Sequence, residues 1–304
     1  MNKDKTQWFI PASLFQSSVI PSIFPRVLLC GIFGVLISIL HDNGFAVSVP
    51  ILGSIIPNVV LGLLLVFRTN TAYDRFWEGR KIWGIINNNI RNLARQLWVC
   101  VDEREPKDRE NKVAALRSLV AFAVATKIHL RSQPVNSELE DLLSAERYSK
   151  LKSMNNPPLE IAFWIGDYMQ QQYEENRLNI YQLTSMQELL NNLVDCLGGC
   201  ERILKTPMPL AYAIHLKQLL LIYCLSLPFQ IVKELGWFTS PIVVLISFTL
   251  LGIEAIGVEI ENPFGHDTND LPLDTICANM RRNMEDLITL APSVRNWNIT
   301  VELQ

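Results

Sequence analysis

The stretch FAVSVPILGSIIPNVVLGLLLVF, residues 45–67, has no charged side chain, and the charged segment RTNTAYDRFWEGRKIWG, residues 68–84, follows it without a break. As a helix the first stretch would be about 34 Å long, which is enough to cross a bilayer core of about 30 Å. A soluble core helix of this length normally carries a polar stripe, whereas this one has only Ser48, Ser54 and Asn58. The sequence therefore predicts a membrane span that continues directly into a helix with charged faces.

The composition indicates a chain that lies partly in a membrane and partly in water. Its 304 residues are 49% hydrophobic, with a mean hydropathy of +0.18 and a net charge of −3. The negative charge argues against a nucleic-acid surface. HExxH, GxSxG and P-loop motifs are absent from the sequence, which argues against an enzyme. The polar start MNKDKTQ does not resemble a signal peptide, and the six cysteines, without a CxxC pair, predict reduced thiols.

Three further apolar stretches predict membrane helices. Residues 27–40 reach about 18 residues with their flanks, a marginal length for a span. They connect to the 45–67 span through HDNG, a turn sequence at residues 41–44. Residues 210–232 and 237–258 complete a second hairpin, joined by KELG. The sequence therefore predicts four membrane spans.

The positions of Arg and Lys predict the orientation of these spans. Arg26 precedes the first span, and the turn after that span has no Arg or Lys. Four basic residues follow the second span: Arg68, Arg75, Arg80 and Lys81. By the positive-inside rule both chain termini are predicted to be cytoplasmic. Lys217 and Glu254 interrupt the last two spans, and Lys217 is predicted either to reach the interface or to face a water-filled path.

The segment between the two hairpins predicts a cytoplasmic helical bundle. We expect no run long enough to span a membrane in it, whereas an apolar seam at steps of three and four residues indicates helix packing. That seam comprises Leu183, Met186, Leu190, Leu193, Leu197, Cys200 and Leu204. Residues 1–25 predict an irregular arm at the membrane interface. Within one domain, residues 1–304, we expect a first hairpin at 26–67, the helical region at 68–207, a second hairpin at 208–258, and an acidic loop and tail at 259–304.

Two motifs carry a resemblance to a known family. FRTNTAYDRFWEGRKIWG, Phe67–Gly84, resembles the signature that follows the second membrane helix of bestrophins, most closely the bacterial and plastid branch. ENPFGHDTNDLPLD, Glu261–Asp274, resembles the family's NPFG segment and acidic loop. The resemblance implies an all-α integral membrane protein with four transmembrane helices and a cytoplasmic helical bundle. It also implies a homopentamer in a bacterial inner, plasma or thylakoid membrane.

The resemblance also implies a pore. Four spans of one chain give too little wall to enclose an aqueous path, so a ring of identical subunits is expected. The family's hydrophobic neck corresponds to Leu52, Ile56 and Val60. The copies of each residue from all subunits would form a ring of aliphatic side chains, and such rings can gate a pore by dewetting. A second, cytoplasmic aperture corresponds to Met208 in TPMPLAY. The alternative for the neck residues is that they are ordinary aliphatic side chains facing lipid or other helices.

The acidic loop resembles the calcium clasp of animal bestrophins. The corresponding residues are Glu259, Asn262, Asp267 and Asp270. Their hard oxygens suit Ca²⁺, although non-acidic residues interrupt the acidic run here. The alternative is a turn rich in Asp and Asn that caps helices and docks on a neighbouring subunit. No other cofactor is expected.

The predicted function is a homopentameric channel that passes small monovalent anions, namely chloride and alternatively bicarbonate. An aliphatic neck lacks the electropositive ring edges of Phe, so a channel for monovalent cations such as sodium is a second hypothesis. A non-conducting membrane scaffold or sensor is a third, from a different class. The charged helix at residues 68–80 is interpreted as a structural ion network, and the alternative is that Arg68 faces the pore and attracts anions.

Overall fold

The computed structural model describes residues 19–49 and 55–290, and in these ranges helices are the only regular secondary structure. The predicted all-α fold is therefore confirmed for the described chain. Two compact units make up the chain, the first comprising Met1–Trp77 and Thr206–Asp270 and the second Glu78–Lys205 and Leu271–Gln304. Helix α3 (Ile55–Cys100) belongs to both, because it continues without interruption from the apolar stretch into the charged one.

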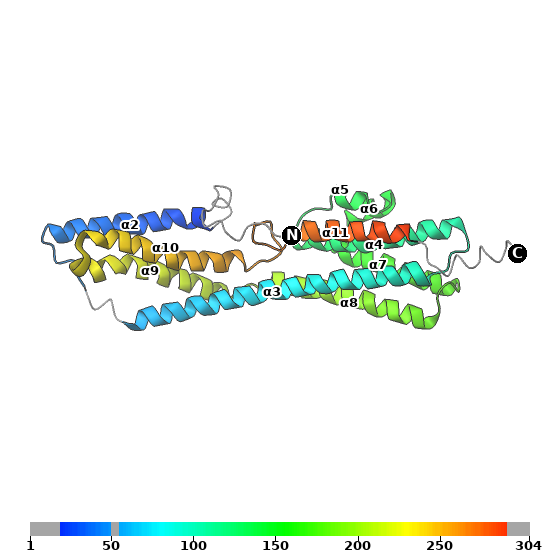
Figure 1. Cartoon of the computed structure of the whole chain (residues 1–304), viewed down its shortest axis with the longest axis horizontal. Helices are drawn as coiled ribbons and strands as arrows, with labels where there is room; N and C mark the ends of the chain where they lie inside the picture. The colour runs from blue at the N-terminus through cyan, green and yellow to red at the C-terminus, as the bar shows by residue number, and fades with distance from the viewer. Residues whose placement is uncertain (1–18, 50–54, 291–304) are drawn as a thin grey trace. The chain divides into compact units, whose positions relative to one another are not determined.

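The first unit is a bundle of long apolar helices. Figure 1 shows α2 (Ile20–Asp42), α9 (Leu210–Leu235) and α10 (Thr239–Glu259) side by side, with the 3₁₀ turn η2 (Gly236–Phe238) between the last two. By length and composition, α2 and the α9–α10 stretch are apolar enough to cross a membrane. The second predicted hairpin is thus present as two helices joined at Gly236, which has a φ of +50°.

Helix α2 is longer than the sequence predicts. It has 23 residues because it begins at Ile20, with Pro21 in its first turn, where the missing N–H of proline costs no hydrogen bond. The prediction of an irregular arm is therefore wrong for residues 20–25, and its earlier part, residues 1–18, lies outside the described residues. The helix ends at the predicted turn, where Gly44 has a φ of +86°.

The predicted helix over residues 45–67 is wrong at its start. Residues 45–49 are not helical, and Val49 donates a backbone hydrogen bond of 2.9 Å to the carbonyl of Phe229. Residues 50–54 lie outside the described chain, and α3 is described from Ile55 on. Pro57 therefore stands in the first described turn of α3, so it does not shift the helical register after it.

Close contact between α2 and α10 depends on two glycines. A Cβ atom on Gly31 would lie 2.6 Å from Cγ2 of Val244, and one on Gly34 would lie 3.1 Å from the Cα of Ser240. The hydroxyl of Ser240 donates to the carbonyl of Gly31 at 2.8 Å. Small residues of this kind let helices approach closely where water supplies no hydrophobic drive.

The second unit is a helical bundle built around α4 (Pro106–Leu130). Its other helices are α5 (Ser137–Glu140), α6 (Ala145–Leu151), α7 (Pro157–Glu174), α8 (Ile180–Lys205) and α11 (Leu273–Thr289). Helix α4 contacts α7, α11, α8 and α5, and the later part of α3 lies against α8, where Gly199 leaves room for Ile82. The predicted seam on α8 is confirmed from Leu183 to Cys200, and after it Ile203 is buried in place of Leu204.

Helix α4 corrects one expectation, because its length and composition would allow it to cross a membrane. Within its own unit, however, 78% of its most apolar window is buried. Two of its buried side chains are lysines: Lys112 meets Glu103 at 3.0 Å, and Lys127 meets Glu138 at 2.7 Å. Helix α4 is therefore the packed core of its own unit, where partner residues of the same unit compensate its buried lysines.

Candidate functional site

The part of α3 in the first unit has one packed face and one uncovered face. Leu61, Leu65 and Arg68 are buried at helical spacing, and the two leucines belong to a core with Ile23 and Leu216. The opposite side of the helix stays exposed within the subunit. Its apolar members are Val59, Val60, Leu63, Val66 and Phe67. We call the part of this side formed by Val60, Leu63 and Phe67, which spans about 60° of the helix at 100° per residue, the free face of α3.

Of the three predicted neck residues, Val60 can be placed. Its side chain is 48% exposed and lies on the free face of α3. Leu52 lies outside the described residues, and Ile56 belongs to α3 although the structure does not describe its side chain. The neck as a whole stays a prediction. Sequence reasoning did not include Leu63 and Phe67, although their offsets of three and seven residues from Val60 place them on the same side.

Met208, the predicted cytoplasmic aperture, is part of a polar junction beside α3. Its backbone N–H donates to Oε1 of Glu261 at 2.8 Å, and its Sδ lies 3.6 Å from a guanidinium nitrogen of Arg68. The other Glu261 oxygen is 3.5 Å from Arg68. We call Arg68, Met208 and Glu261 the Arg68 junction. Glu261 was not singled out from sequence, although it opens the ENPFG motif.

Arg68 itself is 2% exposed, so the alternative that it faces a pore and attracts anions is wrong for this structure. Its Nε is buried without a hydrogen-bond partner among the described residues. Arg75, two turns further along α3, donates to the carbonyls of Glu261 and Thr206. The two arginines hold the segments before α9 and after α10 against α3, which agrees with the structural interpretation of this charged region.

The acidic loop after α10 is closed by its own hydrogen bonds. The backbone N–H of Asp267 donates to Oδ2 of Asp270 at 2.8 Å, and the N–H of Asp270 donates to the carbonyl of Asp267 at 3.0 Å. Gly265 is required here, because a Cβ atom would lie 2.6 Å from the same Asp270 oxygen. Elsewhere in the loop, Asn269 donates to Glu259 at 2.9 Å, and Asn262 accepts from the N–H of Phe264 at 3.3 Å.

This loop brings Asp267 and Asp270 together, while Glu259 and Asn262 are each held by a different partner. Within residues 19–49 and 55–290, His, Cys, Asp and Glu side chains form no group of three suited to a metal ion. Calcium would have to replace N–H donors on oxygens that now stabilise the loop. The hydrogen bonds within the loop are those of a turn rich in Asp and Asn, the alternative to a calcium clasp. Calcium binding stays a prediction.

A pair of charges lies inside the apolar bundle of the first unit. Glu254 of α10 is buried, and its Oε1 lies 4.0 Å from Nζ of the half-exposed Lys217 of α9. That oxygen accepts no hydrogen bond from a described residue. Two adjoining cavities of about 260 and 360 Å³ are both lined by this pair and by Arg26 of α2. The sequence signal was plain, since a charge within an apolar run is rare unless it has a role.

The chain is similar over nearly its whole length to several curated proteins. It is 67% identical over 299 residues to a voltage-dependent anion channel-forming protein of Nostoc sp., and this match covers 98% of the chain and 97% of the relative. It is also 30% identical over 277 residues to the voltage-dependent anion channel-forming protein YneE of Escherichia coli, covering 90% of each. These names, together with the apolar helices, indicate a membrane channel and not an enzyme.

Solved structures and a family model also show similarity over most of the chain. A bacterial bestrophin homologue from Klebsiella pneumoniae matches with a TM-score of 0.79 and 30% sequence identity, covering 89% of this chain and 100% of that one. The family model described as bacterial/fungal bestrophin protein matches residues 1–286. The chain therefore belongs to the bacterial and fungal bestrophin family.

Proposed function

We propose that this protein is an anion channel formed by a ring of identical subunits, with the free face of α3 lining the pore. Five copies are expected from the family, and four spans per copy: α2, the apolar part of α3, α9 and α10. Both termini would then be cytoplasmic. Leu52, Ile56 and Val60 would form the neck, and Met208 would line a second aperture. The permeant ion would be chloride, with bicarbonate as the alternative.

The observation that carries this proposal is the unequal burial around α3. Leu61, Leu65 and Arg68 pack inside the subunit, whereas Val60, Leu63 and Phe67 are 48%, 52% and 62% exposed. An apolar face that its own subunit leaves uncovered must meet lipid, another subunit or a dewetted pore.

Anion selectivity is supported by the relatives' names and by Phe67. The edge of an aromatic ring is electropositive, and Phe67 lies about 20° round the helix from Val60, at 100° per residue. Phe67 from all subunits would form a ring of electropositive edges, which would favour anions over cations. The aliphatic neck residues would supply no such preference. Removing the aromatic ring by Phe67→Leu should therefore reduce the preference for chloride over sodium.

A cation channel is the second candidate, because of Asp74. Its carboxylate is exposed in the subunit and lies about 40° from Val60 round α3, so it would enter the same path. Rings of carboxylates favour cations. Reversal potentials of the purified protein in bilayers with asymmetric NaCl separate the candidates. A shift towards the sodium potential that Asp74→Asn abolishes would replace the anion proposal by the cation one.

The position of α3 is tested by two matched substitutions. Val60→Ser and Val66→Ser change the same side chain at similar exposure, but the two positions are about 120° apart round the helix. If Val60 lines a dewetted neck, its serine variant should raise single-channel conductance or open probability, since a hydroxyl favours water in the constriction. Val66→Ser should change neither.

Equal effects of the two substitutions would contradict a pore-lining free face of α3. Absence of flux from liposomes, for the unmodified protein and every variant, would favour a scaffold or sensor. Native mass spectrometry tests the number of subunits independently of conduction.

If the acidic loop binds calcium, Asp267→Ala combined with Asp270→Ala should alter the calcium sensitivity of the channel. An open probability of the unmodified channel that is the same at all calcium concentrations would contradict a role of the loop as a calcium sensor.

A further inference from the structure

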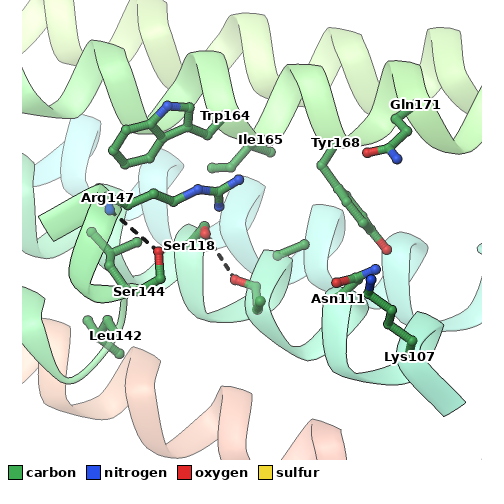
Figure 2. A pocket seen from close by; sticks show the side chains of 13 residues that line it. Lys107, Asn111, Ser118, Leu142, Ser144, Arg147, Trp164, Ile165, Tyr168 and Gln171 are labelled. Carbon is green, nitrogen blue, oxygen red and sulfur yellow. Dashed lines mark hydrogen bonds between the residues drawn. The ribbon is translucent and has the colours of Figure 1, made fainter. Parts of the chain in front are cut away.

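The second unit contains a cavity that the proposed ion pathway does not use. It has a volume of about 460 Å³ and is bounded by α4, α7 and the start of α6 (Figure 2). Its floor is made of buried residues, including Ala115, Ser118 and Ile165. Lys107, Asn111, Ser144 and Gln171 at its rim are exposed. This size is typical of pockets for small molecules, which run from roughly 300 to 1,000 Å³.

The cavity is electrically one-sided. Lys107 and Arg147 are the only charged residues among the 13 that line it, and none of the 13 is acidic. The remaining polar groups are amides and hydroxyls, which hydrogen-bond anions as readily as neutral groups. Two cations and no carboxylate in the wall favour an anion, most strongly at the Arg147 end, because Glu103, Asp108 and Glu175 act on Tyr168 at the other end.

Arg147 is held in place without a counter-charge. Its guanidinium carbon lies 5.1 Å from the ring centroid of Trp164, and Figure 2 shows the side chain extending into the cavity beside the indole. Arg147 forms no ion pair with a described residue. Lys150, which lies over the same indole at 5.9 Å, is paired with Glu160 at 2.8 Å. A stacked guanidinium with an open hydrogen-bonding fork is ready to bind a carboxylate or phosphate.

The other end of the cavity also supplies donors. The hydroxyl of Tyr168 is buried without a hydrogen-bond partner among the described residues, and in Figure 2 it points towards Asn111 and Lys107. Burial raises the pKa of Tyr168, so the phenol keeps its proton at neutral pH and acts as a donor. Ser118, at the arginine end, already donates to the carbonyl of Ala114 at 2.9 Å and therefore offers an acceptor only.

We propose that this cavity binds an elongated small-molecule dianion, one acidic group held by Arg147 and the other by Lys107 and the hydroxyl of Tyr168. The separation of the two ends follows from α7, because Arg147 lies over Trp164 and Tyr168 follows four residues, or about 6 Å, later on this helix. Two acidic groups several bonds apart span this distance. Dicarboxylates and linear polyphosphates both have this shape, and the binding chemistry is the same.

Calorimetric titration of the full chain in detergent tests this site without any conduction. The probes are adipate and tripolyphosphate at constant ionic strength, with malonate as the short dianion and hexanoate as the monoanion. We expect adipate or tripolyphosphate to bind, and malonate and hexanoate to bind at least about tenfold more weakly. The better of the two long probes identifies the class of acidic group.

The variants Arg147→Gln and Lys107→Gln should each weaken the better probe by about tenfold or more. Tyr168→Phe removes the hydroxyl alone and should weaken it by roughly threefold. Lys150→Gln is the matched control, because it lies over the same indole but is paired and does not line the cavity; we expect a change within about twofold.

The proposal is overturned if the folded, unmodified protein binds neither long probe at about 10 mM. It is also overturned if Arg147→Gln leaves binding unchanged, or if Lys150→Gln weakens binding as much as Arg147→Gln does. Because none of these outcomes depends on ion flux, failure of this site and failure of the channel proposal are distinguishable.

Discussion

In the second unit, the buried lysines of α4 are paired: Lys112 lies 3.0 Å from Glu103, and Lys127 lies within 2.8 Å of both Glu138 and Asp274. In the first unit, Glu254 is buried to a similar degree, yet its nearest cation, Lys217, is 4.0 Å away and half exposed. A buried charge costs several kcal/mol unless close partners compensate it, of the order of 3–5 when one partner is removed.

The difference suggests different roles for the charges in the two units. The close ion pairs of Lys112 and Lys127 in the second unit connect α4 to α5, to α11 and to the chain before α4. These pairs therefore stabilise the packing of the unit. The loosely paired carboxylate in the first unit contributes little to its own bundle. Under-paired polar groups are retained where they serve a ligand, an ion or a partner. Five substitutions test this comparison.

Arg68→Met should have the largest effect, because the Arg68 junction holds a buried guanidinium 3.5 Å from the carboxylate of Glu261. The substitution removes the cation from Glu261 and should lower the free energy of unfolding by about 3 kcal/mol. Thermal unfolding in detergent measures this loss. Arg80→Met, at an exposed position on the same helix, is the control and should change stability by less than about 0.5 kcal/mol.

Lys112→Met should have the next largest effect. It removes the ammonium group that Glu103 and the carbonyls of Trp98 and Val101 share, while Glu103 keeps its ion pair with Arg109 at 3.6 Å. We expect a loss of about 2 kcal/mol. Denaturation followed by circular dichroism gives the value. Arg117→Met, on an exposed position of α4, should be nearly neutral. If Lys112→Met were as neutral as this control, the paired lysines of the second unit would not be structural.

Glu254→Gln should leave stability within about 0.5 kcal/mol of the unmodified protein, since it removes a charge that is poorly compensated and keeps the shape. Lys217→Met should instead destabilise by about 1 kcal/mol, because it deprives the buried carboxylate of its cation. Unfolding of both variants in the same detergent gives the comparison. A loss above about 2 kcal/mol for Glu254→Gln would mean that the carboxylate has a close structural partner in the assembled protein.

Asp274→Asn should have the smallest effect, and it should depend on pH. Burial would raise the pKa of Asp274, but its hydrogen bonds to Lys127 and Arg131 outweigh this, so the pKa lies below 3.8. Because the pKa is lower in the folded state, the stabilising contribution is present above pH 3.8 and is lost as pH falls through the folded-state pKa. The exposed carboxylate limits the effect to about 0.5 kcal/mol.

The measurement for Asp274→Asn is the free energy of unfolding of the two proteins from pH 7 to pH 3. Their difference should shrink as the pH falls and vanish once the carboxyl group is protonated in both folded and unfolded states. A difference that is constant over this range would show that the substitution acts through packing of α11 and not through charge.

Local patterns in the sequence were sufficient for most of the helices. The seam on α8 and the turns at Gly44 and Gly236 follow from side-chain periodicity and from residues that tolerate positive φ. The start of α3 was predicted too early, because the absence of charged residues was given more weight than Pro50 and Gly53, and residues 45–49 are not helical. The true length of α2 was missed because residues 20–25, which include Pro21 and Pro25, were assigned to the irregular arm.

The site was predicted less completely than the fold. Val60, Met208 and the acidic loop came from the resemblance, and the structure places Val60 on an uncovered face and Met208 against Arg68. The burial of Arg68 and its pairing with Glu261, 193 positions later in the sequence, depend on helices that meet only after folding. No local pattern could indicate that pairing.

The amino-acid sequence alone determined that the chain is helical, that it has long apolar segments, and which family it resembles, since these depend on periodicity, composition and contiguous motifs. Only the tertiary structure decided which side of α3 is packed, which buried charges are closely paired, and that Arg147 and Lys107 share a cavity. Those properties arise from contacts between residues distant in the chain, and burial determines how strongly their charges act.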